Sequence, residues 1–302
     1  MKKILITGAS GRIGYKVLKR LLIESKYDIM ILDLKSKYAL KKLNNYNSRV
    51  KLIYGDINDT TLMDTLIQNT DYVIHLAGIN MQLSEIRRDL TDIINYDGTL
   101  NIVNSIIKNG NKAELIYLSS LAVYGDVKNI TVDMSVDKKT NNYFIKTLIK
   151  CENLIKKKIQ NYKILRIAPI IDNIKDDEIF NISLNKDIEL LKLNNLIELI
   201  VSIINKKNIT SSIMNVSSGE KYRIKLKDYL YKLANGNLIS FKMLIKIIFN
   251  KKNNYSSYIN DLVDINNEFN YQDGSIDDFI NTITHKHYYL SSFFTKLYLR
   301  SK

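Results

Sequence analysis

The sequence predicts an α/β fold, with a doubly wound parallel sheet followed by a smaller, mostly helical C-terminal region. Short apolar runs alternate with stretches of helical periodicity through the first half of the chain. The runs are almost continuously apolar, as in strands that helices cover on both faces. A glycine-rich turn joins the first run to the first helical stretch. Together these observations favour parallel strands that are linked by helices.

The order of the elements supports this fold class. Strands are predicted near residues 3–7, 28–33, 50–54, 71–76, 113–119 and 162–168, and helices near 12–25, 59–69, 86–109 and 141–160. Parallel neighbours need long crossover connections, which the intervening helices provide. After Pro169 the pattern is less regular. We expect a helix near 194–206, a strand at 213–216 that returns to the sheet, and helices near 225–235 and 275–284, while residues 236–260 receive no assignment.

The turn after the first strand carries the pattern T-G-x-x-G-x-x-G, with Gly8, Gly11 and Gly14. Without Cβ atoms the backbone turns sharply and lets a diphosphate approach closely. The N-terminus of the following helix offers free N–H groups and the positive end of its dipole. The turn therefore predicts a dinucleotide site, although a tight turn between strand and helix would use the same residues.

Asp33, at the end of the second predicted strand, supports the dinucleotide interpretation. An acidic residue about 20 residues beyond the glycines accepts hydrogen bonds from the ribose hydroxyls in the Rossmann fold. Its charge repels a 2′-phosphate, which favours NAD over NADP. Lys35 and Lys37 follow closely and weaken this preference.

Composition limits the other function classes. The chain has 302 residues with a single Cys, so no disulfide framework or cysteine metal cluster is predicted, and a reducing cytoplasm is the expected location. The N-terminus does not have the pattern of a signal peptide, and no apolar run reaches membrane-spanning length. The net charge of +14 comes mostly from Lys scattered among Asn, Ile and Tyr. We interpret it as a solvated surface and predict no nucleic-acid partner.

Further landmarks follow the predicted strands in order. They are GDI at 55–57, HLAG at 75–78, NYDGTLN at 95–101, YLSSLAVYG at 117–125, LRIAP at 165–169 and NVSSGE at 215–220. With the glycines they resemble the extended short-chain dehydrogenase/reductase superfamily, specifically the NAD-dependent epimerase/dehydratase family that acts on nucleotide sugars. The resemblance implies an NAD-binding domain over residues 1–170, joined by the late strand, and a substrate-binding region over 171–302.

The resemblance also implies which residues contact NAD. The expected cofactor-binding residues are Gly8, Gly11, Arg12, Ile13, Gly14, Asp33, Asp56, Ile57, Leu76, Ala77, Gly78, Asn95 and Ala168. Asp56 would accept a hydrogen bond from the adenine amine. Asn95 matches a position whose amide either contacts the cofactor or ties helix to sheet. His75 sits at a landmark that is structural in this family.

The reactive centre of this family is a Ser or Thr, a Tyr and a Lys, and here Ser120 and Tyr143 match the first two. A tyrosine with a pKa near 10 needs a nearby cation before it can serve as a base. The family pattern Y-x-x-x-K fails, because Thr147 stands four residues after Tyr143. Lys146 can replace the missing lysine, Lys150 can reach in from the next turn, or the redox chemistry is lost. We take Ser120, Tyr143 and Lys146 as the catalytic candidates.

The second half of the chain gives weaker signals. Arg166 and Arg223 are candidates for substrate phosphates or for structural ion pairs. In the C-terminal segment, His285 and His287 lack metal-ligand spacing, and no metal site is predicted. The apolar and basic side chains of this segment suit either weak contact with an anionic membrane surface or packing against the protein. Family analogy suggests a homodimer through the predicted helices at 86–109 and 141–160.

The first hypothesis is therefore a cytoplasmic NAD-dependent enzyme acting on a nucleotide sugar, as an epimerase or reductase. Leu121 and Ala122 follow Ser120, so the acid–base pair with which a dehydratase expels water is missing there. The alternative is a non-catalytic dinucleotide-binding protein, a sensor or assembly partner that kept the fold but lost the Tyr-x-x-x-Lys pair.

Overall fold

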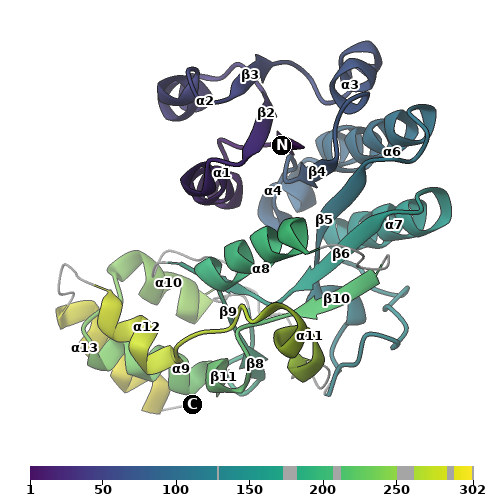
Figure 1. Cartoon of the computed structure of the whole chain (residues 1–302). Coiled ribbons are helices and arrows are strands. Elements are labelled where there is room, and N and C mark those ends of the chain that lie inside the picture. Colours follow the sequence, from purple (N-terminus) through teal and green to yellow (C-terminus); the bar gives the residue numbers. More distant parts are fainter. Residues whose placement is uncertain (128, 173–181, 207–211, 250–261, 284–288, 301–302) are drawn as a thin grey trace. The chain divides into compact units, whose positions relative to one another are not determined.

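The computed structural model describes residues 1–127, 129–172, 182–206, 212–249, 262–283 and 289–300 (Figure 1). The chain separates into two compact units. The first contains Met1–Val123, Val136–Arg166 and Ile197–Met214, and the second contains Tyr124–Ser135, Ile167–Leu196 and Asn215–Lys302. None of the helices in the described ranges is long and apolar enough to cross a bilayer.

A seven-stranded sheet organises the first unit, with the order β10-β6-β5-β4-β1-β2-β3. The strands are β1 (Lys2–Thr7), β2 (Tyr27–Asp33), β3 (Lys51–Tyr54), β4 (Tyr72–His75), β5 (Glu114–Ser120), β6 (Tyr162–Ile167) and β10 (Ser212–Val216). β1 pairs in parallel with β2 and β4, β2 with β3, and β4 with β5. The order runs outward from β1 in both directions, which confirms the predicted doubly wound fold. In such sheets ligands bind at the carboxyl ends of the strands beside the reversal of order.

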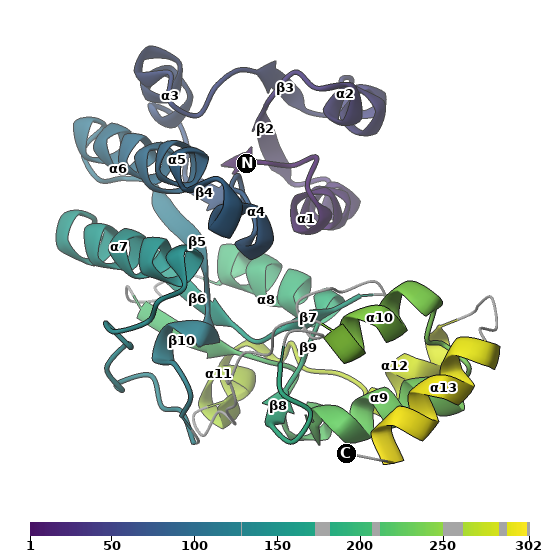
Figure 2. The same cartoon turned by 180° about the vertical axis from the view of Figure 1, so that it is seen from behind.

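Helices cover both faces of this sheet (Figures 1 and 2). One face carries α1 (Arg12–Glu24), α2 (Lys37–Leu43) and α8 (Leu193–Asn205), and the other carries α3 (Thr60–Ile67), α6 (Gly98–Lys108) and α7 (Tyr143–Lys158). Arg20 of α1 donates two hydrogen bonds to Glu198 of α8, at 2.7 and 2.9 Å. Apolar residues at helical spacing, such as Val17, Leu18 and Leu21, form the buried stripe of α1.

The helix predicted at 86–109 is interrupted. The chain forms α4 (Met81–Ile86), α5 (Arg88–Thr91), a π-helical segment η2 (Asp92–Asp97) and then α6. The backbone leaves helical geometry at Arg87, with φ of −121° and ψ of 71°. Polar contacts between these segments and the rest of the unit stabilise the interruption. Apolar periodicity alone does not reveal such contacts. The short helix α2 was also missed.

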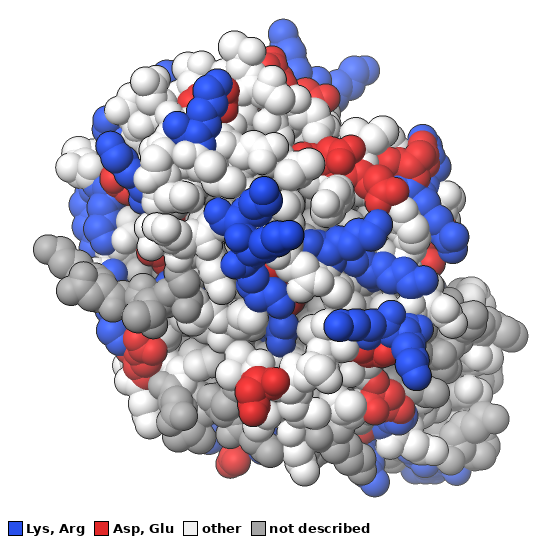
Figure 3. All heavy atoms as spheres, turned by 90° about the vertical axis from the view of Figure 1, so that its right-hand side faces the viewer, with Lys and Arg blue, Asp and Glu red and all other residues white. Residues whose placement is uncertain are grey.

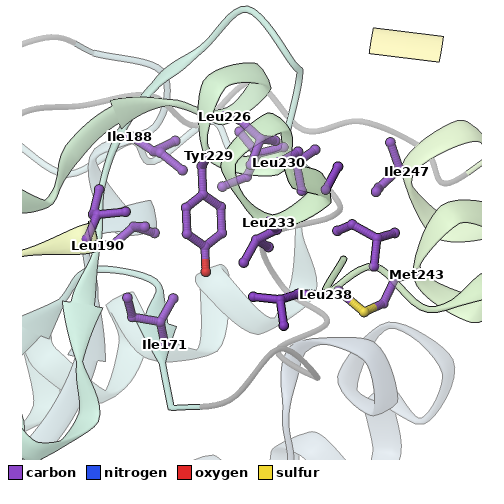
Figure 4. Close-up of a cluster of buried hydrophobic side chains, with 14 of the residues drawn as sticks. Ile171, Ile188, Leu190, Leu226, Tyr229, Leu230, Leu233, Leu238, Met243 and Ile247 are labelled. Atoms are coloured by element: carbon purple, nitrogen blue, oxygen red, sulfur yellow. The ribbon is translucent and has the colours of Figure 1, made fainter. Parts of the chain in front are cut away.

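The second unit is mostly helical. Its two small sheets pair β7 (Ile170–Ile171) with β9 (Leu191–Lys192) and β8 (Asp187–Glu189) with β11 (Arg223–Lys225). Its helices are α9 (Leu226–Asn235), α10 (Phe241–Phe249), α11 (Leu262–Phe269), α12 (Ile276–Thr282) and α13 (Tyr289–Arg300). Figure 4 shows apolar side chains of α9 and α10 packed with Ile171 of β7, Ile188 of β8 and Leu190, which lies between β8 and β9. The predicted late strand is β10, whereas the division of the chain at residue 170 stays a prediction.

A buried ion pair joins β5, α7 and β6. Arg166 donates to both oxygens of Glu152, at 3.0 and 2.6 Å, and Ser119 donates to Glu152 Oε1 at 2.6 Å. Arg166 is 2% exposed and Glu152 is 1% exposed. Of the two roles that the sequence left open for Arg166, the structure therefore shows the ion pair.

Replacing Glu152 with Ala should lower the free energy of unfolding by about 3–5 kcal/mol, because the Arg166 charge would stay buried without its partner. Urea unfolding of both proteins measures the difference. Glu198→Ala is the matched control, since its side chain is 45% exposed, and a surface pair contributes about 1 kcal/mol or less. Equal losses in the two variants would contradict the importance of burial.

Candidate functional site

The glycine turn lies directly against the segment that follows β4. Gly8 has a φ of +71°, and a Cβ atom there would lie 2.7 Å from the backbone N and Cα of Ala77. A Cβ on Gly14 would lie 2.4 Å from the carbonyl oxygen of Gly8. Gly11 is the N-cap of α1 and offers no side-chain cap to its first turn. The N-terminus of α1 therefore has no side-chain cap from its N-cap residue, and a helix N-terminus of this kind suits an anion.

Asp33 is held beside this turn. Its Oδ2 accepts a hydrogen bond from the Ser10 N–H at 2.7 Å, and its Oδ1 accepts one from the Ser10 hydroxyl at 3.1 Å. Lys42 donates to the Ser10 carbonyl at 3.1 Å. Each oxygen of a carboxylate has further lone pairs. The half-buried Asp33 can therefore still accept hydrogen bonds from the hydroxyls of a ribose.

The loop after β3 contributes Asp56 and Ile57. Asp56 is exposed, and its Oδ1 accepts from the N–H of Asn58 at 2.9 Å. The carbonyl of Ile57 accepts from the amide of Asn101 at 2.7 Å. A Cβ on Gly98 would lie 2.8 Å from Ile57 Cγ2. The glycine therefore lets Ile57 pack against the start of α6, and the loop presents Asp56 to solvent.

His75 supports the start of the segment Leu76–Gly78 through the hydroxyl of Thr7. Thr99 Oγ1 donates to the Asn95 carbonyl at 2.6 Å, so it accepts from His75 Nε2 at 3.0 Å. His75 Nδ1 then accepts from Thr7 Oγ1 at 2.9 Å, and Thr7 Oγ1 accepts from the N–H groups of Leu76 and Ala77 at 3.2 Å each. This network assigns the hydrogen of the neutral ring to Nε2. It agrees with the structural role expected for His75.

Asn95 makes two hydrogen bonds with the backbone of Ile79. Its Oδ1 accepts from the Ile79 N–H at 2.8 Å, and its Nδ2 donates to the Ile79 carbonyl at 3.1 Å. A Cβ on Gly78 would lie 3.2 Å from Asn95 Oδ1. The side chain thus ties η2 to the loop after β4.

Two further predicted residues, Ser120 and Ala168, belong to different units. Ser120 is half-buried at the end of β5, and its Oγ accepts from the Ala122 N–H at 3.2 Å. Ala168 belongs to the second unit, where its N–H donates to the Val216 carbonyl at 2.8 Å. Arg223 donates to Glu189, which is 1% exposed, at 3.0 Å. This contact is the structural ion pair that the sequence allowed for Arg223.

Tyr143 begins α7 and is surrounded by charged side chains. Its hydroxyl donates to Asp92 Oδ2 at 2.5 Å, and its N–H donates to Glu85 Oε1 at 2.6 Å. The guanidinium of Arg88 lies 5.1 Å from the centre of its ring. The hydrogen bond to Asp92 raises the pKa of Tyr143 above its ordinary value. This direction is the opposite of what a phenolate base needs.

The two candidate lysines point to other surroundings than the Tyr143 hydroxyl in the part of the chain that the structure describes. Lys146 is exposed, and Lys150 Nζ lies 5.9 Å from the centre of the Tyr96 ring. Thr147 is buried, and its hydroxyl donates to the Tyr143 carbonyl at 3.0 Å. Within the described residues, no hydrogen bond or ion pair joins Tyr143 to Lys146 or Lys150.

Sequence reasoning missed Glu85, Arg88 and Asp92. Helical spacing could not have grouped them, because they lie in α4, α5 and η2 and the backbone leaves helical geometry at Arg87. His285 and His287 lie outside the described residues. Among the residues that the structure describes, no group of three or more His, Cys, Asp or Glu side chains is arranged to hold a metal ion.

Burial lowers the pKa of His75 from 6.5 to about 4. As the pH falls, the unfolded chain therefore gains a proton that the folded protein does not bind. The free energy of unfolding should decrease as the pH falls from about 6.5 to about 4, by about 3 kcal/mol from this residue. Urea unfolding at several pH values checks this for the wild type and for His75→Gln, which lacks the titrating ring. The same pH dependence in both would contradict it.

Comparisons with known proteins agree with this fold and site. D-erythronate dehydrogenase of Haemophilus influenzae is 32% identical over 127 residues, covering 41% of this chain and 39% of that protein. The dTDP-L-rhamnose 4-epimerase of Burkholderia thailandensis is 30% identical over 133 residues, covering 41% of this chain and 36% of that protein. The matches thus span about two-fifths of the length of these curated relatives.

Solved structures match almost the whole chain. The UDP-glucose 4-epimerase of Bifidobacterium longum, in complex with NAD+ and UDP, has a TM-score of 0.74 and 18% identity and covers 98% of both chains. The UDP-glucuronic acid 4-epimerase of Bacillus cereus, in complex with NAD, has a TM-score of 0.71 and 20% identity, covering 98% of this chain and 99% of that one. At these identities the likeness establishes the fold.

The model of the 3-beta hydroxysteroid dehydrogenase/isomerase family matches residues 5–167, more than half of the 302. This range includes the glycine turn, Asp33, the His75 network and the Tyr143 helix. The chain therefore belongs to the 3-beta hydroxysteroid dehydrogenase/isomerase family, and its curated relatives include epimerases of the nucleotide-sugar type that its sequence resembles.

Proposed function

We propose that this protein binds NAD and acts as an oxidoreductase on a nucleotide sugar, as an epimerase or a reductase. One observation carries the proposal: the uncapped N-terminus of α1 follows a glycine turn that is tied to Asp33 through Ser10. A helix N-terminus attracts a diphosphate, and a carboxylate in this position recognises the adjoining ribose. The relatives support the redox class, since those named above are dehydrogenases and epimerases.

The residues present fit NAD. The first turn of α1 would hold the diphosphate, Asp33 the adenosine ribose and the exposed Asp56 the adenine amine. A 2′-phosphate would place further negative charge beside Asp33, which favours NAD over NADP. When bound, NAD accepts a hydride from the substrate. Both solved structures described above hold NAD.

A nucleotide sugar is the substrate class that we infer for the second unit, which corresponds largely to the predicted substrate-binding region at 171–302. Both solved relatives are named for UDP-sugars. Ser120 would hydrogen-bond the reacting hydroxyl of the sugar, and Tyr143 would take part in removing its proton. Which sugar is bound depends on side chains that the family pattern does not specify.

The Tyr143 helix favours a second candidate function, a dinucleotide-binding protein without catalysis. Thr147 replaces the lysine of the family pattern, and the pKa of Tyr143 is raised by its hydrogen bond to Asp92. Lys146 and Lys150 form no hydrogen bond or ion pair with Tyr143 among the described residues. Such a protein would bind NAD as tightly as an enzyme and leave every sugar unchanged.

A turnover screen separates the two functions. Wild type and Tyr143→Phe are incubated with NAD and a panel of nucleotide sugars, and epimers or oxidised products are measured. We expect the substitution to lower kcat by about a hundredfold or more, because acid–base catalysis contributes that much, with unchanged NAD affinity. Tyr162→Phe in β6 is the matched control. Wild type and Tyr143→Phe performing alike on every sugar would contradict the enzymatic function.

Membrane-surface contact through the C-terminal segment stays a prediction. Phe293, Phe294 and Leu297 of α13 are exposed, while Thr295 and Leu299 of the same helix are buried. The helix therefore both packs against its own unit and presents apolar side chains to its surroundings. These two features correspond to the two alternatives that the sequence left open.

The homodimer through α6 and α7 also stays a prediction, and the charge of α7 makes it testable. Every exposed charged residue of α7 is a lysine: Lys146, Lys150, Lys156, Lys157 and Lys158. Figure 3, turned to the side on which α6 and α7 lie in Figure 1, shows Lys and Arg side chains gathered across this face. Two such helices in one interface would repel each other.

Salt should therefore strengthen the dimer, because it screens exposed like charges over about 10 Å at 0.1 M. Sedimentation velocity at low and high ionic strength checks the dimer fraction, and Lys146→Gln/Lys150→Gln should raise this fraction at low salt. A monomer under all conditions would contradict the dimer. A dimer that dissociates as salt is added would contradict the role of the lysines.

A further inference from the structure

Tyr143 receives three contacts from a single stretch of chain that belongs to the same unit. Asp92 Oδ2 accepts a hydrogen bond from the Tyr143 hydroxyl at 2.5 Å, and Glu85 Oε1 accepts one from the Tyr143 N–H at 2.6 Å. The guanidinium of Arg88 lies 5.1 Å from the centre of the Tyr143 ring. Glu85 also accepts the N–H of Phe144 at 3.4 Å. The stretch therefore holds both the backbone and the side chain of Tyr143.

Asp92 is the first residue of the π-helical segment η2, and neighbouring contacts determine its position. One residue earlier, Thr91 is fully buried and donates to the Arg87 carbonyl at 2.9 Å. Three residues later, Asn95 is fixed to Ile79 by two hydrogen bonds. Because a π-helical turn contains an extra residue, it changes which residues share a face, and such turns are frequent at functional sites. Here η2 directs Asp92 to Tyr143 and Asn95 to the loop after β4.

The chemistry at Tyr143 differs from a lysine-assisted phenolate. A cation lowers the pKa of a tyrosine, whereas the Asp92 carboxylate raises it. Tyr143 is therefore a neutral hydroxyl that donates a hydrogen bond to a carboxylate. A hydroxyl in this arrangement keeps its own lone pairs and can accept a second proton while it releases the first.

We propose that Asp92 serves in place of the missing lysine, as the acceptor of the Tyr143 proton in a two-step relay. This inference rests on the proposed function. The sugar O–H proton passes to Tyr143 Oη while the Tyr143 proton passes to Asp92 Oδ2. The carbinol C–H bond breaks, its electron pair leaves with the hydrogen as hydride to NAD, and the carbinol carbon is oxidised to a carbonyl. Reduction of the carbonyl reverses both proton transfers.

Asp92 acts through Tyr143 and is thus a positioning residue as well as a proton acceptor. Thr147 fits this arrangement, because its buried hydroxyl donates to the Tyr143 carbonyl and needs no counter-charge. A lysine in its place would bring a cation to the buried side of α7. The relay accounts for a retained Ser120 and Tyr143 beside an absent lysine.

The first test is a titration of Tyr143 that needs no substrate. The full-length protein carries ¹³C-labelled tyrosine, and Tyr143→Phe identifies the Tyr143 signal. In Asp92→Asn the pKa of Tyr143 should fall toward its ordinary value, because a neutral amide replaces the carboxylate. Asp89→Asn is the matched control, since Asp89 pairs with Arg87 on the same stretch. An unchanged Tyr143 titration in Asp92→Asn overturns the proposal.

The second test measures turnover with UDP-glucose and UDP-glucuronic acid as probes. Asp92→Asn should lower kcat by about a hundredfold, while KM and NAD affinity stay within about twofold and Asp89→Asn behaves as the wild type. A combined loss of folding and activity is detected by urea unfolding, and Asp92→Glu, which keeps the carboxylate, should recover part of kcat.

The outcomes separate this inference from the proposed function. An active wild type with an equally active Asp92→Asn overturns the relay alone. If the wild type oxidises neither probe nor any other nucleotide sugar in the panel, the proposed function fails. The relay is then overturned with it, and the Tyr143–Asp92 hydrogen bond has a structural role.

Discussion

The close approach of the β1–α1 turn to the backbone after β4 is the constraint on which the site depends. A Cβ on Gly8 would overlap Ala77, and one on Gly14 would overlap the Gly8 carbonyl. These contacts place the N-terminus of α1 at the carboxyl edge of the sheet, next to the point where the strand order reverses. Ligands of open α/β sheets bind at that edge. Asp33 is tied to the same turn through Ser10, so the helix N-terminus and the carboxylate share one support.

Buried polar contacts extend this support from the sheet to the helices. His75 links Thr7 on β1 to Thr99 on α6, and Thr99 donates to the carbonyl of Asn95. Each hydroxyl has a defined role as donor or acceptor, so the network leaves little freedom for the ring. A neutral histidine suits this position, because burial disfavours its charged form. The loop Leu76–Gly78 is consequently fixed at its start by hydrogen bonds to Thr7 of the sheet. The adjoining Ile79 is fixed by Asn95 of η2.

The contacts around Tyr143 depend on the interruption of the helix that the sequence predicts at 86–109. Periodicity predicts a continuous helix at 86–109, but α4, α5, η2 and α6 follow one another with different geometries. The interruption lets Glu85, Arg88 and Asp92 all reach Tyr143, and it lets Asn95 reach Ile79. Hydrogen bonds to another helix and to a loop hold this course. A pattern of apolar residues along one helix carries no information about such partners.

The sequence by itself determined the parallel fold, the family and the glycine turn followed by Asp33. Glycine spacing, apolar strands and the position of Asp33 are local features whose physical meaning does not depend on distant contacts. Only the tertiary structure decided which side chains contact Tyr143. The sequence offered Lys146 and Lys150 as partners, while the folded chain exposes Lys146, places Lys150 over Tyr96 and brings Asp92 to the hydroxyl. The physical reason is that a partner from another helix depends on packing and register, which spacing within α7 cannot reveal.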